Sequence, residues 1–160
     1  MDRSTVRLSR GIAVGCALSV GLAGAAWGDS NPVTVSDAWT RPTAAGASAA
    51  GYLTIVNHAR FADSLTGLTD PDAASASVHE SRTVGGVTSM RPLLSLAVPA
   101  GGSVALKPGG LHVMLRGVKH ALKPGDQTTL ILTFAKAGRV RVVLRVRATA
   151  TPDLMAGMKM

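Results

Sequence analysis

Apolar and polar residues alternate in short runs from Val33 onward, and Gly, Pro, Asn and Asp separate the runs. Alternation with a period of two predicts β-strands, because successive side chains of a strand point to opposite faces. No run of ten or more residues shows the helical period. The pattern predicts an all-β domain, a Greek-key sandwich or barrel. We expect its strands within residues 33–40, 51–57, 63–69, 75–81, 90–98, 102–107, 111–116, 127–135 and 138–148.

The last of these strands alternates most clearly, with apolar residues on one face and arginines on the other. The apolar face holds Val140, Val142, Leu144 and Val146, and the opposite face holds Arg139, Arg141, Arg145 and Arg147. Two interpretations remain open. The arginines form either a solvated face that discourages edge pairing or a docking stripe for an acidic partner.

The chain divides into three predicted segments. Residues 1–28 combine three arginines with a short run rich in Gly and Ala, which is typical of a secretory signal peptide cleaved near Asp29. A retained N-terminal anchor is the alternative, although no second hydrophobic stretch follows. Residues 33–149 form the β domain, and residues 150–160 form a flexible tail that contains methionines. The expected location is therefore the periplasm, without stable membrane insertion after cleavage.

The cysteine count and the charge exclude several classes of function. Cys16, the one cysteine of the chain, lies within the predicted signal peptide, where lipoprotein-type acylation is a weak alternative. The exported domain then has no thiol, which excludes disulfides, thiolate metal sites and a blue-copper centre. Its charge is +6, the +8 of the whole chain less +2 in residues 1–28. An exported basic domain meets little nucleic acid, so we expect no nucleic-acid partner.

The predicted strand at residues 111–116 has an unusual second face. Leu111, Val113 and Leu115 supply one apolar face, so His112 and Met114 lie on the other. We expect that second face to be exposed to solvent, as the outer face of a sandwich is. A thioether beside an imidazole then offers donors to a metal ion instead of packing in a core.

His79 and Met90 supply a second pair of donors. His79 has the outward parity in the strand at 75–81, and Met90 begins the next strand after a predicted loop at 81–89. A hairpin-like connection can bring both residues beside His112 and Met114. Two imidazoles and two thioethers suit Cu(I), since the set lacks the thiolate or carboxylate that favours Zn²⁺ and the oxygen ligands that Ca²⁺ needs.

The spacing of these four residues resembles a known signature. It is similar to the H-x(10)-M-x(21)-H-x-M pattern of the PCu(A)C family of periplasmic copper chaperones, and the resemblance covers nearly the whole predicted domain. It implies a cupredoxin-like β-barrel that holds one Cu(I) through His79, Met90, His112 and Met114. It also implies delivery of that copper to the dinuclear copper site of cytochrome c oxidase subunit II.

Other candidate residues fit less well. We expect His58 to be a solvated or capping residue and His120 to lie outside the ligand spacing, while Trp39 and Tyr52 pack in the core. A hydrolytic set of Ser77, His79 and Glu80 is not expected, because neighbours on a strand point to opposite faces. The tail methionines, Met155, Met158 and Met160, are either incidental or a loose second copper site.

Three functions therefore compete, and the first two share one site. The first is a non-enzymatic copper chaperone that passes Cu(I) to oxidase subunit II, another copper-site apoprotein or a thiol-based copper assembly protein. The second is a periplasmic copper buffer. The third is a β-sandwich that binds protein or carbohydrate without metal, although the low aromatic content of 3% argues against stacking on sugars.

Overall fold

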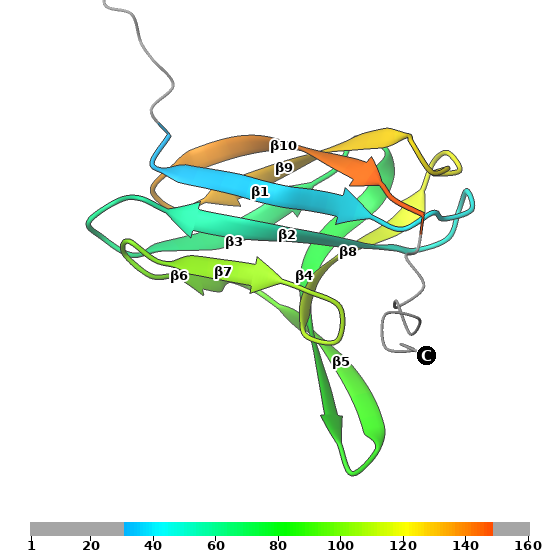
Figure 1. Cartoon of the computed structure of the whole chain (residues 1–160), viewed down its shortest axis with the longest axis horizontal. Helices are drawn as coiled ribbons and strands as arrows, with labels where there is room; N and C mark the ends of the chain where they lie inside the picture. Colours follow the sequence, from blue (N-terminus) through cyan, green and yellow to red (C-terminus); the bar gives the residue numbers. More distant parts are fainter. Residues whose placement is uncertain (1–30, 149–160) are drawn as a thin grey trace, which may run out of the picture.

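The computed structural model describes residues 31–148, which form ten strands and contain no helix that could span a membrane (Figure 1). The strands are β1 (Val33–Thr40), β2 (Ala49–Asn57), β3 (Asp63–Thr69), β4 (Ala73–Val84), β5 (Val87–Leu93), β6 (Leu96–Val98), β7 (Ser103–Leu106), β8 (Leu111–Val118), β9 (Gln127–Phe134) and β10 (Gly138–Val146). The predicted signal peptide, Cys16 and the tail from residue 149 onward lie outside the described residues.

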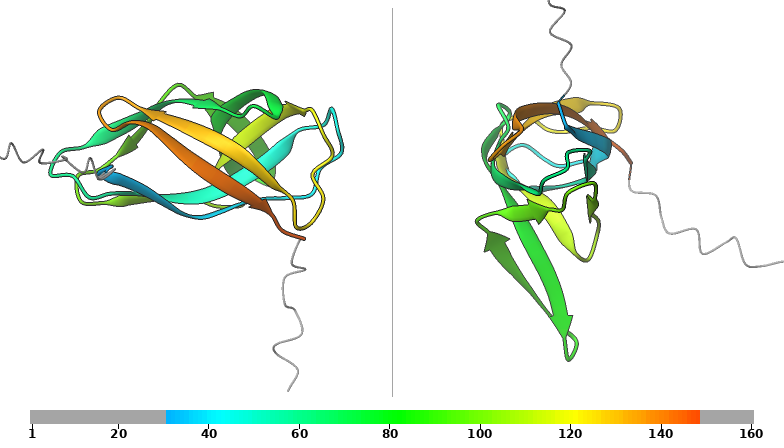
Figure 2. Two further views of the ribbon diagram at one scale, coloured as in Figure 1. Left: turned by 90° about the horizontal axis from the view of Figure 1, so that it is seen from above. Right: turned by 90° about the vertical axis from the view of Figure 1, so that its left-hand side faces the viewer.

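The strands form one strongly curved sheet. Its order is β5-β4-β8-β2-β1-β10-β9-β3-β6, and β7 adds to the free part of β2. The β1–β10 pair is parallel and the other pairs are antiparallel. Seen end-on, the sheet curls into a flattened barrel (Figure 2). The prediction of an all-β barrel or sandwich is confirmed.

Alternate residues of the strands fill the barrel interior. Leu53 and Ile55 of β2, Val113 and Leu115 of β8 and Leu144 of β10 are buried with exposed fractions of 1% or less. The inward faces of the other long strands join the same core cluster. Burying these side chains is the main stabilisation of the fold, at about 1.5–3 kcal/mol for each large aliphatic residue. Residues of the opposite parity are left on the outer face.

The observed strands agree closely with the predicted ones at β1 and β3, whose bounds are identical. Two predictions were wrong. The run at 90–98 is two strands, β5 and β6, because the chain leaves β4 at exposed Leu94 and joins β3 instead. Residues 81–89 are not a loop, since β4 continues to Val84 and β5 begins at Val87.

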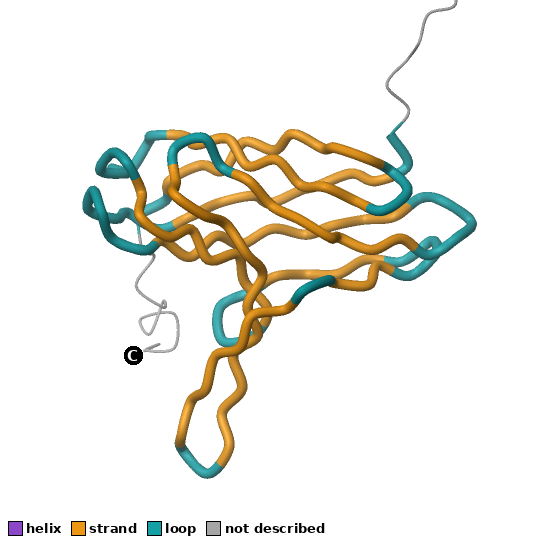
Figure 3. The backbone as a smooth tube through the Cα atoms, turned by 180° about the vertical axis from the view of Figure 1, so that it is seen from behind, coloured by secondary structure: helices purple, strands orange, loops and turns teal. Residues whose placement is uncertain are grey.

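Residues 81–90 project from the barrel as a two-stranded ribbon, here called the hairpin arm (Figures 1 and 3). Its turn is formed by Gly85 and Gly86, both with positive φ (58° and 78°), which matches the two-residue turns preferred by hairpins. Outside the arm, β4 also pairs with β8, from Ala73 to Glu80. The arm therefore begins next to the part of the sheet that carries the predicted metal ligands.

Candidate metal centre

His79 of β4 and His112 of β8 lie directly opposite each other in an antiparallel strand pair. Their ring centroids are 5.9 Å apart, and the ring planes are tilted by 39°. The neighbouring pair, Val78 and Val113, points into the core, so the histidines lie on the outer face of the sheet. Two imidazoles predicted from sequence spacing are thus brought together.

The strand register places both methionines on the same face as the histidines. Met114 is opposite Ser77, two residues before His79, and Met90 is opposite Ser81, two residues after it. Because the side-chain period of a strand is two, Ser77, His79 and Ser81 share one face with their partners. The strands β5, β4 and β8 are adjacent in the sheet (Figure 1). Their register therefore places all four predicted ligands on one face.

The two methionines lie at opposite ends of the histidine pair. Met114 is half-buried on β8, whereas Met90 is at the base of the hairpin arm and 58% exposed. Two strand spacings and four residues separate them, which corresponds to roughly 16 Å between their Cα atoms in an ideal flat sheet. His79, His112 and Met114 are thus the compact part of the set. To reach a metal ion that the other three residues bind, Met90 has to come closer to them. Bending of the arm or twist of the sheet can achieve this.

The expectation that this outer face is open to solvent is wrong for the histidines. His79 and His112 have exposed fractions of 5% and 4%. Gly110, the residue before β8, continues the pairing of β8 with β4. Its carbonyl accepts hydrogen bonds from the Ser81 N–H and from His112 Nδ1, both at 3.1 Å. Each ring is shielded further by the other. The histidine pair therefore lies near the base of the arm with little of either side chain exposed.

Hydrogen bonds orient both imidazoles. A carbonyl oxygen can only accept, so His112 Nδ1 carries the proton in this contact and Nε2 keeps its lone pair. This leaves His112 Nε2 as the ring atom that can ligate a metal, with Gly110 fixing the tautomer. His79 Nε2 lies 3.0 Å from the Ser77 hydroxyl, which holds that ring in place. The sequence did not lead us to either hydrogen-bond partner, Ser77 or Gly110, although Ser77 is expected on the same face of the strand as His79.

The surroundings of His79 favour its neutral imidazole. Burial lowers the pKa of His79, and the nearby His112 and Arg116 lower it further. Among residues 31–148, no three His, Cys, Asp or Glu side chains lie close enough together to hold a metal ion. Met114 and Met90 offer sulfur donors on the same face as this pair. Such a neutral, soft donor set is the kind that Cu(I) prefers.

The other two histidines lie away from this face. His58 follows β2 at the opposite end of the strand, is exposed, and its Nε2 is 2.9 Å from the Thr34 hydroxyl. His120 follows the end of β8 and is also exposed. Both locations agree with the expectation that neither is a ligand.

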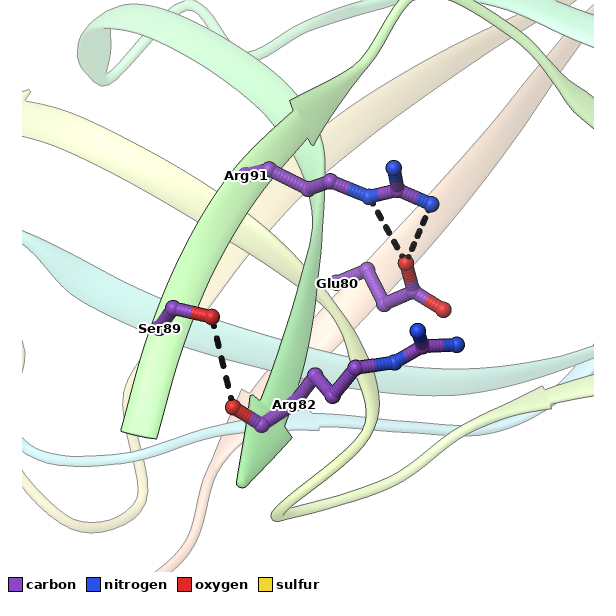
Figure 4. A network of polar contacts seen from close by, with 4 residues as sticks. All are labelled: Glu80, Arg82, Ser89 and Arg91. Atoms are coloured by element: carbon purple, nitrogen blue, oxygen red, sulfur yellow. Dashed lines mark hydrogen bonds and ion pairs between the residues drawn. The ribbon is translucent and has the colours of Figure 1, made fainter. Parts of the chain in front are cut away.

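A hydrolytic arrangement is not formed. Ser77 contacts His79, but Glu80 is on the opposite face of β4 and binds Arg91 of β5 (Figure 4). Arg91 Nε and Nη2 lie 2.9 Å and 2.8 Å from the same Glu80 oxygen. This cross-strand ion pair instead agrees with the β4–β5 register that places Met90 beside Ser81.

Trp39 and Tyr52 form an aromatic pair on the outer face, so the expectation that both belong to the core is wrong for Trp39. Their ring centroids are 4.6 Å apart, Tyr52 is buried and Trp39 is half-buried. Ala50 is opposite Met114, and Tyr52 follows on the same face of β2. The aromatic pair therefore borders the candidate metal centre.

Comparison with known proteins identifies the family. Residues 33–146 match the family model described as "Putative lipoprotein LpqE-like". The putative lipoprotein Lxx21020 of Leifsonia xyli subsp. xyli (strain CTCB07) is 32% identical over 116 residues, which cover 72% of this chain and 69% of that protein. The lipoprotein description indicates a location outside the cytoplasm.

Solved structures agree with this family. The copper-bound PCuAC domain from PmoF2 matches with a TM-score of 0.61 and 26% identity, over 73% of this chain and 93% of that domain. The Cu(I) form of DR1885 from Deinococcus radiodurans matches with a TM-score of 0.50 and 27% identity, over 71% and 78% of the two chains. Both are described as copper-bound, and neither as an enzyme. The resemblance to the PCu(A)C family and its cupredoxin-like fold is confirmed, and the chain belongs to the LpqE-like family of putative lipoproteins.

Proposed function

We propose that this protein is an exported, non-enzymatic metallochaperone that binds one Cu(I) per chain. His79, His112 and Met114 supply the compact part of the site, and Met90 completes it from the base of the hairpin arm. The observation that carries the proposal is the facing pair of His79 and His112, with Met114 on the same surface. The copper-bound relatives support the choice of metal.

The donor chemistry supports Cu(I) rather than a divalent ion. Imidazole nitrogen and thioether sulfur are neutral, so the complex keeps the positive charge of the ion, and Arg116 adds to it. A divalent ion bound by the same side chains would lack the anionic ligands that stabilise it in many other sites. Monovalent, soft copper is therefore the best match to this set.

The position of the site suits transfer better than storage. The ligands lie on the outer face of the sheet, and Met90 is exposed at its edge. A partner's thiolate or imidazole can displace Met90 first and take the ion while the histidines still hold it. We propose the dinuclear copper site of cytochrome c oxidase subunit II as acceptor, with another copper-site apoprotein or a thiol-based copper assembly protein as further partners.

A transfer assay separates a chaperone from a copper buffer. Cu(I)-loaded protein is mixed anaerobically with the apo copper domain of an oxidase subunit II, the two are separated, and copper is measured in each. If the protein is a chaperone, copper should move to the acceptor faster than it moves to a small chelator of equal affinity. Retention of copper, with tight binding in the absence of acceptor, would support the buffer instead.

We also propose that the domain acts outside the cytoplasm, in the periplasm or at its membrane surface. The basic and apolar character of residues 1–28 supports export, and the lipoprotein family keeps acylation of Cys16 open as an alternative to cleavage near Asp29. Mass spectrometry of the protein purified from its native host distinguishes these outcomes. An unprocessed N-terminus in the cytoplasmic fraction would contradict export.

A further inference from the structure

The arginines of β10 have no role in the proposed metal site. They project from the outer face, where β10 alternates between exposed and buried residues as predicted. Within residues 31–148, none of them forms an ion pair with a carboxylate, and the one ion pair found there joins Arg91 to Glu80. Several unpaired guanidinium groups on one strand create a positive field that attracts anionic partners. The arginines are Arg139, Arg141 and Arg145 of β10, and Arg147, which follows the strand and lies over the Trp39 ring at 5.8 Å.

A groove runs beside these arginines between β1 and β10. The two strands pair through Trp39–Arg145 and Thr40–Val146 and diverge from there, as the view from above shows (Figure 2). A bulge in β1, where Asp37 has a φ of 49°, coincides with the divergence and bends β1 away. The space between the strands has a volume of about 370 Å³.

The groove combines an apolar floor with a positive rim. Its walls are residues 35–38 of β1 and residues 140–143 of β10. Val35, Ala38, Val140 and Val142 belong to or pack against the barrel core, whereas Val143 faces outward. Arg141, Arg145 and Arg147 line it together with one carboxylate, Asp37, which leaves a net charge of +2. The backbone edges of the two strands face each other here without pairing among the described residues. An unpaired strand edge is a template for a further extended segment.

The outward-facing side chains of β10 set the distance between the groups that a bound peptide has to match. Arg141, Val143 and Arg145 follow at two-residue intervals on the outer face, and Val143 is 46% exposed. The repeat on an extended strand is about 6.8 Å, so the two arginines are roughly 14 Å apart. An extended peptide beside residues 140–143 has the same repeat. Beyond them β1 pairs with β10 at Arg145, so there the peptide meets only the Arg145 side chain, which lines the groove. Two carboxylates four residues apart, with an apolar residue midway, match this surface.

We propose that the groove between β1 and β10 docks an extended acidic segment of a partner protein. The carboxylates of the segment bind Arg141 and Arg145, and its apolar residue contacts Val143. A concave groove bounded by strand edges fits a polypeptide, whose backbone can hydrogen-bond to those edges, better than a flat anionic bilayer. This surface goes beyond the proposed copper transfer and uses none of its ligands.

The groove is close enough to the candidate metal centre for a partner docked there to approach the bound copper. Three strand spacings, about 14 Å, separate β10 from β8, and the Trp39–Tyr52 pair lies between them on the same face. A partner held by its acidic segment would therefore have its copper site near His112. This link to transfer rests on the proposed function, whereas docking itself does not.

The test is a titration of the ¹⁵N-labelled protein, followed by NMR, with the capped heptapeptide Thr-Asp-Thr-Val-Thr-Asp-Thr. We expect saturable shifts at residues 35–38 and 140–147, which disappear in about 0.5 M salt because screening is then short-ranged. A peptide of the same composition with adjacent aspartates, Thr-Thr-Val-Asp-Asp-Thr-Thr, should bind about tenfold more weakly. The double variant Arg141→Gln/Arg145→Gln should lose about tenfold in affinity.

Matched controls make the outcome specific. The variant Arg60→Gln/Arg82→Gln removes the same charge outside the groove and should change affinity less than about twofold. Equal binding of the two peptides, or equal loss in both double variants, would overturn the proposal in favour of unspecific attraction. Binding to vesicles of phosphatidylglycerol and phosphatidylcholine without peptide binding would also overturn it. The variant His112→Ala/Met114→Ala should bind the peptide normally, so failure of copper binding and failure of docking are distinguishable.

Discussion

His79 and His112 face each other across β4 and β8, with their ring centroids 5.9 Å apart and each ring almost fully buried. They lie on the side of the sheet away from the barrel core, where buried polar rings contribute little packing. This facing arrangement is the geometric basis of the proposed Cu(I) site. Each ring is held by a hydrogen bond, to Ser77 and to Gly110 respectively. Such preorganisation lowers the cost of ordering the ligands when a metal binds.

The two methionines should differ in importance. Met114→Ala should weaken Cu(I) binding by roughly 10- to 100-fold, because Met114 is on β8 beside the histidine pair. Met90→Ala should weaken it by a smaller factor, since the arm must bend to bring this residue to the metal. Competition titrations measure both effects. Thermal unfolding provides the control, because Met114 lies opposite the core face; unfolding of Met114→Ala would mean that this residue serves packing.

Acid should release the metal and also destabilise the apo-protein. The pKa of His79 lies below 6.5 because of burial, His112 and Arg116, so the folded protein resists protonation there more than the unfolded chain does. Stability that is present above pH 6.5 is therefore lost as the pH falls through the lower folded value. Urea unfolding of the apo-protein between about pH 7.5 and pH 5 tests this. The pH dependence should shrink in His79→Gln, and an unchanged dependence would contradict the assignment.

Copper retention should follow the same histidines. We expect copper release below about pH 6, because protonation removes the imidazole lone pairs that bind the ion. The lowered pKa of His79 should let copper stay bound at a lower pH than an ordinary histidine would allow. Dialysis at stepwise lower pH, with copper measured afterwards, checks this expectation. Full retention at about pH 4.5 would indicate that sulfur alone holds the ion.

Asp63 should stabilise the fold without affecting the metal. Its carboxylate accepts hydrogen bonds from the N–H groups of Ser64, Lys136 and Ala137 at 2.7, 2.9 and 2.8 Å. Burial alone would raise its pKa, but these bonds together lower it below 3.8. Asp63→Asn should cost about 1–3 kcal/mol at neutral pH. The difference from wild type should vanish as the pH falls through the folded pKa, whereas Cu(I) affinity should not change.

Removing the tail should leave one copper bound. The domain ligands all precede residue 115, so a chain that ends at Thr151 keeps the complete set. Copper analysis after gel filtration of the shortened protein measures the ratio. One equivalent with unchanged affinity is expected. Complete loss of binding would place the site among Met155, Met158 and Met160.

Much of the fold and of the site was predictable because parity is a local property. Alternation in the sequence predicted β1 and β3 with identical bounds, and it assigned His79, His112 and Met114 to the face opposite the core. Burial of the histidines was not predictable. It depends on the cross-strand partner and on the Gly110 connection, which are tertiary features.

The errors at residues 81–98 have physical causes as well. Both faces of the hairpin arm meet solvent, so its sequence lacks the apolar alternation by which strands are recognised. The run that contains Leu94 is mostly apolar from Leu93 to Val98, and we interpreted it as one strand although its strand partner changes. The side chain of Leu94 is 95% exposed at that point, which a hydrophobic pattern does not predict.

The central claim is a single Cu(I) held between His79 and His112 with methionine sulfur. The most direct measurement is an anaerobic competition titration of the mature domain with Cu(I) against a chromophoric chelator, beside the variant His112→Ala/Met114→Ala. We predict one tight equivalent in the wild type and its loss in the variant, with Asp63→Asn as a binding-competent control. Absence of tight binding, or binding that the double substitution leaves unchanged, would contradict the account.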